Sequence, residues 1–261
     1  MATYKKRGYK PKKEKVAQEV EENFDESQST TAEVFNTLDE TANKSEQWIE
    51  KNSKPLFFGL IAIAVIILGY LGYTKFISEP NQQEASNELA FPRTFFDKAE
   101  KSAGVAADSL YNIGLTGGST GKYGFTDIAD EFSGTKAGNI ANYYAGISYL
   151  KMKKYEEAIE YLSNFNSDDE LLGATALGAI GDAFADIDQA KEALDYYQKA
   201  ANKKQNDFTS PLFLFKAGQT AMSLEEYSTA EKLFTTIKQK YANTDQGRDI
   251  DKYINSAKYA Q

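Results

Sequence analysis

The chain has 261 residues, no cysteine, no histidine and a formal net charge of −8 at pH 7. The two missing residue types exclude thiol nucleophiles, Ser-His-Asp triads, disulfides and zinc sites with Cys or His ligands. The charge is uneven, because residues 1–15 carry seven Lys or Arg against one Glu, whereas residues 75–261 carry 20 basic and 27 acidic side chains and would repel a nucleic acid.

Residues 1–54 form a leader that we expect to be cytoplasmic and largely disordered. Residues 16–33 are acidic, polar and poor in apolar side chains. From residue 34 to 50, apolar residues that include Trp48 follow a helical spacing and predict an amphipathic helix. We favour a helix in the membrane interface over one that docks a cytoplasmic partner. The basic start would contact anionic lipid or, alternatively, ribosomal RNA or another acidic partner.

Residues 55–74 form an uncharged apolar run, PLFFGLIAIAVIILGYLGYT. Twenty residues at a rise of about 1.5 Å give about 30 Å of helix, which is the thickness of the hydrocarbon core of a bilayer. Aromatic residues near both ends and the lack of a polar face favour a transmembrane helix over a buried helix of a soluble domain. No cleavage site follows, so the run predicts an anchor that is retained.

The positive charges around this run predict its orientation. Ten Lys or Arg precede the run, which places the N-terminus in the cytoplasm and the C-terminal part outside it. Gly59, Ala62 and Gly69 share one face of the helix, and such small residues would let a partner helix in the membrane approach closely.

Residues 75–133 predict a linker, a helix that leads into the next region and a degenerate first hairpin. Their aromatic and aliphatic residues are helically spaced, but Pro92 and a glycine-rich turn interrupt the pattern.

Residues 134–261 predict three repeats of about 35 residues and a C-terminal capping helix within residues 244–260. The three repeats start near Asn139, Ala174 and Pro211. Each contains a glycine in its first helix, an alanine in its second helix and a large side chain four residues after that alanine. The three sets are Gly146, Ala158 and Leu162; Gly181, Ala193 and Tyr197; and Gly218, Ala230 and Phe234.

This pattern resembles the tetratricopeptide repeat. The resemblance implies an all-α fold, in which a single N-terminal transmembrane helix precedes a solenoid of tetratricopeptide-type helical hairpins. Glycine and alanine would let the two helices of a hairpin touch, and the large side chains would fill the layer between hairpins. The chain departs from the repeat pattern at Ala190 and Ala221, where an aromatic residue is expected, and no proline closes a unit.

Two Ser-x-x-Glu pairs predict capping boxes at helix starts, Ser167 with Glu170 and Ser223 with Glu226. The acidic residues 168–170 therefore indicate a helix first turn rather than a metal or acid/base site.

No catalytic motif is complete. The segment LTGGSTGKYGF resembles a P-loop, but Thr116 stands at the first glycine position and Tyr123 follows the lysine. No activated nucleophile or acid/base pair stands out, so we expect neither an enzyme nor a cofactor or metal site.

The remaining functional feature is a surface. In this type of repeat the first helix of each hairpin lines a groove that holds a segment of another protein. Several candidates could instead be ordinary packing between hairpins. The groove candidates are Tyr143, Ile147, Lys151, Asp182, Asp186, Phe215, Gln219 and Met222.

The leader, the anchor and the repeats ending in KQKYANTDQGRDIDKYI together resemble the bacterial ancillary Sec-translocon subunit family over residues 55–261. The resemblance implies a protein of the inner membrane with a periplasmic repeat domain, which passes emerging chains from the channel to periplasmic chaperones. Its partners would be translocon subunits, chaperones or exported clients, and the lipid bilayer. The longer leader departs from the family. The rival interpretation is a periplasmic scaffold that coordinates cell-wall or outer-membrane assembly, and a third, remoter one is an organellar import receptor.

Overall fold

The computed structural model describes residues 30–260, so the basic start and most of the stretch predicted to be disordered lie outside the described residues. Every regular element in the described range is a helix, which confirms the all-α prediction there. The chain divides into two compact units, residues 1–68 and 69–261, which are described separately.

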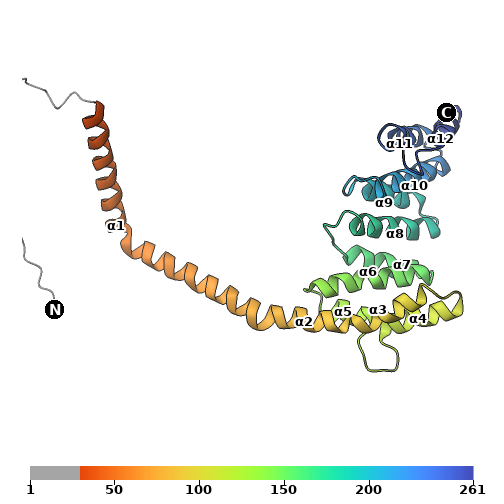
Figure 1. Ribbon diagram of the computed structural model, residues 1–261, viewed down its shortest axis with the longest axis horizontal. Helices are drawn as coiled ribbons and strands as arrows, with labels where there is room; N and C mark the ends of the chain where they lie inside the picture. Colours follow the sequence, from red (N-terminus) through yellow and green to blue (C-terminus); the bar gives the residue numbers. More distant parts are fainter. Residues whose placement is uncertain (1–29, 261) are drawn as a thin grey trace, which may run out of the picture. The chain divides into compact units, whose positions relative to one another are not determined.

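The helix α1 (Thr30–Tyr73) begins in the first unit and ends in the second, and it joins the segments predicted at 34–50 and 55–74 into one helix (Figure 1). Pro55 lies inside α1, where it removes one backbone N–H donor without ending the helix. α1 is long and apolar enough to cross a membrane. No residue of its most apolar 18-residue stretch is buried within the described structure. Large apolar side chains such as Phe58 and Ile66 are about two-thirds exposed.

After α1, the second unit continues as helix where a linker was expected. The π-helix η2 (Thr74–Ser78) leads directly into α2 (Glu79–Glu88). Pro80 stands at the start of α2, directly after the π-helical turn, and lacks the N–H that would otherwise bond to a carbonyl of that turn. The side chain of Gln82 accepts a hydrogen bond of 3.0 Å from the backbone N–H of Lys136, which ties α2 to the start of the repeats.

Three helices follow α2, namely α3 (Ala90–Ala99), α4 (Val105–Thr116) and α5 (Phe125–Glu131). α3 and α4 form a hairpin, and α5 packs on the first repeat helix. The glycine-rich segment is the turn between α4 and α5, and it follows a helix rather than the strand that a P-loop requires. At Gly117 the backbone has a φ of 72°, and a Cβ would lie 1.8 Å from the carbonyl oxygen of Lys122.

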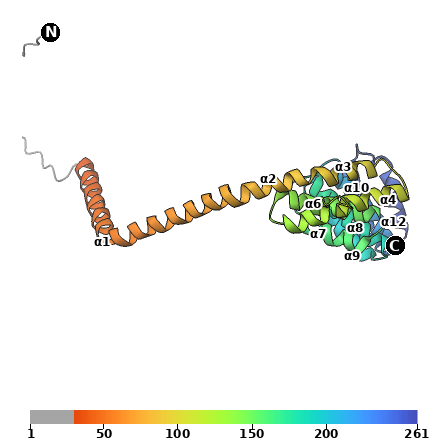
Figure 2. The same cartoon turned by 90° about the horizontal axis from the view of Figure 1, so that it is seen from below.

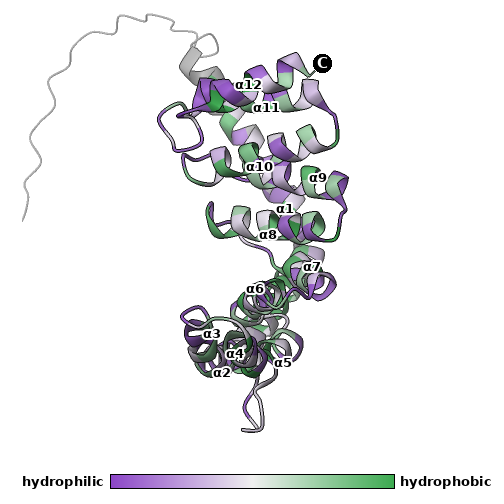
Figure 3. Cartoon of the chain, turned by 90° about the vertical axis from the view of Figure 1, so that its right-hand side faces the viewer, coloured by the Kyte–Doolittle hydropathy of each residue, from purple (hydrophilic) through white to green (hydrophobic). Residues whose placement is uncertain are grey.

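The repeats form three stacked hairpins (Figures 1 and 2). Their helices are α6 (Lys136–Lys151) with α7 (Tyr155–Asn164), α8 (Leu172–Asp186) with α9 (Ala190–Asn202), and α10 (Thr209–Ser223) with α11 (Tyr227–Lys240). Figure 3 shows α8, α10 and α12 in successive layers of the stack. A continuous apolar core that includes Ala193, Phe213 and Phe234 runs from α8 to the last helix.

The predicted glycines lie where the two helices of each hairpin cross. A Cβ at Gly146 would stand 2.4 Å from Leu162 Cγ, and one at Gly181 would stand 2.7 Å from Tyr197 Cδ1. In the third hairpin, a Cβ at Gly218 would stand 2.4 Å from Phe234 Cε1. These separations are shorter than ordinary van der Waals contact, so a side chain at any of the three sites would push the paired helices apart. The predicted close approach of the two helices at the glycine is confirmed. The large side chains were expected between hairpins, but each packs on the glycine of its own hairpin.

A left-handed residue follows the first helix of each of the three repeat hairpins. Lys153, Asp188 and Glu225 have φ values of 60°, 59° and 59°, a conformation that L-residues adopt at a cost. In each turn the N–H of the next residue reaches the carbonyl oxygen five positions back, over 2.9, 2.9 and 2.8 Å. This hydrogen bond is typical of a helix C-terminal cap in which glycine usually occupies the left-handed position.

The predicted capping boxes are replaced by other contacts. The Ser223 hydroxyl donates to the Thr220 carbonyl, and α11 begins only at Tyr227, so the box at Ser223 and Glu226 is wrong. Before α8, the carboxylate of Asp169 accepts hydrogen bonds from the N–H groups of Leu171 and Leu172. These two bonds, that of Leu172 first, lower the pKa of Asp169. The acidic run therefore serves a helix start, but through Asp169 instead of Ser167 and Glu170.

The last helix, α12 (Ile250–Tyr259), closes the stack. Ile250 and Ala257 are buried against the core, and Tyr253 and Ile254 pack partly buried beside them. Most of the other α12 side chains are exposed and polar, as the outer face of a terminal helix requires.

We predict that Glu225→Gly stabilises the second unit by about 0.5–1 kcal/mol, because glycine removes the cost of the left-handed conformation. Thermal unfolding of the full chain in detergent micelles, followed by far-UV circular dichroism, measures the change.

Glu160→Gly is the matched control, because Glu160 is exposed in the middle of α7. That change should destabilise the protein by about 1 kcal/mol. If Glu225→Gly destabilises as much as Glu160→Gly, the left-handed turn carries no strain.

Candidate protein-binding groove

Two cavities lie next to each other along the repeats, and together we call them the groove. The first, the α8 cavity, has a volume of about 410 Å³ and is lined by Leu150, Lys151, Lys153, Tyr155, Asp182, Ala185, Asp186 and Tyr197. The second, the α10 cavity, has about the same volume and is lined by Leu212, Phe215, Lys216, Gln219, Asp245, Gln246, Asp249 and Tyr253. Each is at the small end of the range for ligand pockets.

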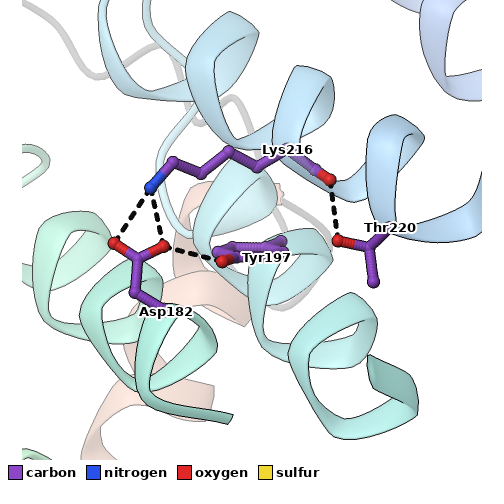
Figure 4. Close-up of polar contacts among 4 residues, drawn as sticks. All are labelled: Asp182, Tyr197, Lys216 and Thr220. Atoms are coloured by element: carbon purple, nitrogen blue, oxygen red, sulfur yellow. Dashed lines mark hydrogen bonds and ion pairs between the residues drawn. The ribbon is translucent and has the colours of Figure 1, made fainter. Parts of the chain in front are cut away.

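The two cavities meet at an ion pair between α8 and α10 (Figure 4). Lys216 Nζ donates to Asp182 Oδ1 over 2.6 Å and to Oδ2 over 2.9 Å. The Tyr197 hydroxyl, from α9, donates to Oδ1 over 2.7 Å. Burial, and then this hydrogen bond, raise the pKa of Tyr197. The cluster ties two hairpins together at the floor of the groove.

Several charged groups of the α8 cavity are already engaged. Lys151 forms an ion pair of 3.4 Å with Glu100, from the α3 end of the domain. Desolvation, and then the neighbouring Asp186 carboxylate, raise the pKa of Tyr155. A ligand in this cavity would have to compete with internal contacts.

The α10 cavity has a more apolar floor. The rings of Phe215 and Tyr253 meet edge to face, with centroids 4.8 Å apart. Leu212 stands on the same face of α10, one turn before Phe215, and is 36% exposed. On the rim, Asp245 pairs with Arg248.

Five of the eight predicted groove residues line these cavities, namely Lys151, Asp182, Asp186, Phe215 and Gln219. The other three pack between helices. Tyr143 lies against Phe165, with ring centroids 5.2 Å apart, and burial raises its pKa. Ile147 packs against the cluster around Ile180, and Met222 against the core around Phe234.

Sequence reasoning missed several lining residues. Leu212 could have been found, because it precedes Phe215 and Gln219 at three- and seven-residue spacing on one helix face. Asp245 and Asp249 could not have been found from the sequence, since they lie in the irregular segment after α11 and no repeat position corresponds to them.

The small residues predicted to pack in the membrane have no partner within the described chain. A Cβ at Gly59 or at Gly69 would meet nothing within 4 Å. Ala62 is exposed like its neighbours. Packing against another membrane helix thus stays a prediction.

Comparison with known families identifies one match. Residues 141–168 match the family model described as a tetratricopeptide repeat, and they cover most of α6 and all of α7. No curated protein matches the chain. The match and the stacked hairpins together support a tetratricopeptide-repeat protein, and repeats of this type are protein-interaction folds.

We predict that Asp182 and Lys216 are energetically coupled by about 0.5–1 kcal/mol, because both side chains are about one-third exposed and their attraction is partly screened. A double-mutant cycle with Asp182→Asn and Lys216→Met, measured by thermal unfolding, gives the coupling. It should shrink in high salt. Strictly additive effects of the two changes would show that the ion pair does not tie the hairpins together.

Proposed function

We propose that this chain is a single-pass membrane protein that holds a segment of another protein in the groove, and that it is not an enzyme. The observation that carries the proposal is the pair of adjoining cavities on a tetratricopeptide-type stack. Their walls come from three successive hairpins and from α12. A groove of this kind suits an extended segment that contacts several hairpins in turn.

The membrane part of the proposal is supported by α1. Its apolar side chains are exposed over a length that suits a bilayer, and water would not favour that arrangement. We propose that residues 55–74 cross the bacterial inner membrane with the N-terminus in the cytoplasm and the repeat domain in the periplasm. The ten basic residues before the span support this orientation.

The finer part of the proposal concerns the partner. We propose that the protein is accessory to the Sec translocon and helps exported proteins reach periplasmic chaperones. The support for this role is the sequence resemblance over residues 55–261. Gly59, Ala62 and Gly69 would face a channel helix within the bilayer.

The orientation has a direct test, because the chain has no natural cysteine. Ser102 is exposed in the turn between α3 and α4. In intact cells, Ser102→Cys should react with a membrane-impermeant thiol reagent added from outside. Labelling only after lysis would reverse the proposed topology.

Crosslinking in living cells tests the partner. A photoreactive amino acid at Gln219 should capture exported proteins or chaperones, and one at Ala62 should capture channel subunits. Glu160 is the control position, since it is exposed on α7 outside both cavities.

Capture of wall synthases or outer-membrane assembly factors alone would contradict the translocon role and favour a scaffold. Identical adducts from Gln219 and Glu160 would show that the groove is not the contact surface.

A further inference from the structure

The α10 cavity differs from the rest of the groove because half of it lies outside the repeats. One wall is the exposed face of α10, with Leu212 and Gln219. The opposite wall is the segment from Asp245 to Asp249 and the first turn of α12, with Tyr253. The terminal helix thus does more than cover the core, since it also closes a cavity at the end of the groove.

The floor of this cavity can accept a large apolar side chain. Phe215 is fixed from below by Phe234, with centroids 5.9 Å apart, and from the side by Tyr253. Both aromatic rings are therefore held before any ligand arrives. A cavity of about 410 Å³ has room for one or two side chains of a peptide. An aromatic or long aliphatic side chain would gain the most from covering this surface.

The rim of the cavity is negative. Lys216 is the cationic residue of the lining, but its ammonium group is neutralised by Asp182. No described side chain pairs with the carboxylate of Asp249, and Asp245 contacts only the solvent-exposed Arg248. A cation next to the apolar side chain would find an unpaired carboxylate at Asp249. The amides of Gln219 and Gln246 are also on the lining and can hydrogen-bond a peptide backbone.

We propose that the α10 cavity is the specificity pocket of the groove, and that it takes an extended segment of a partner protein in which a large apolar side chain adjoins Lys or Arg. The proposal rests on the proposed function of the groove in protein binding. The apolar side chain packs on Leu212, Phe215 and Tyr253. The cation pairs with Asp249.

The probe is a synthetic decapeptide in which p-benzoylphenylalanine, itself aromatic, adjoins a lysine between Gly and Ser residues. A second peptide carries glutamate in place of the lysine. The full chain in detergent micelles is irradiated with each peptide, and the adducts are located by mass spectrometry. Covalent capture records even weak association.

The lysine peptide should label residues of the α10 cavity. Leu212→Glu and Asp249→Lys should each reduce this labelling at least fivefold. Asp249→Lys should instead increase labelling by the glutamate peptide. Two changes outside the cavity serve as controls. Phe208→Glu alters an exposed apolar residue at the start of α10, and Asp97→Lys alters an exposed carboxylate on α3. The lysine peptide should label both control variants as strongly as the unmodified chain. All variants should have the same helix content by circular dichroism.

The possible failures are distinguishable. Labelling confined to the α8 cavity, or equal labelling by the two peptides, would overturn the specificity pocket and leave the groove as a binding surface. Labelling that no groove variant alters would overturn both this proposal and the proposed function.

Discussion

The close approach of paired helices at Gly146, Gly181 and Gly218 is the constraint on which the rest of the second unit depends. At each site the large side chain of the second helix occupies the volume that a Cβ would need. The contact fixes the separation of the two helices in a hairpin. Because the same contact recurs in three hairpins, each presents its first helix in a similar way, and a regular stack results.

The groove follows from that stack. Between the second and third hairpins, a Cβ at Gly178 would lie 1.9 Å from the ring of Phe213, so α10 approaches α8 closely enough for this ring to pack directly on the backbone of α8. This approach brings the carboxylate of Asp182 within 2.6 Å of Lys216 Nζ. The polar cluster at the floor of the groove thus lies one helical turn beyond this glycine contact, on the same faces of α8 and α10.

The sequence predicts what depends on periodicity and misses what depends on local backbone geometry. Repeat spacing is enough to locate the three crossing glycines and their large partners, because packing sets those positions. Lys153, Asp188 and Glu225 carry no such signal, since their left-handed backbone arises from the turn and glycine is the residue usually expected there. The segments expected at 34–50 and 55–74 are one helix, because Pro55 is accommodated inside it. The rim carboxylate Asp249 comes from a segment without repeat symmetry, so only the folded chain brings it to the groove.

The coupling energy between Gly218 and Phe234 tests most directly whether helix contact at the glycines sets the hairpin geometry. Gly218→Val alone should destabilise the second unit by about 2 kcal/mol, because the added side chain overlaps a fully buried ring. In a Phe234→Leu background the same change should cost at least about 1 kcal/mol less, since the smaller side chain leaves room. An equal cost in both backgrounds would contradict the account.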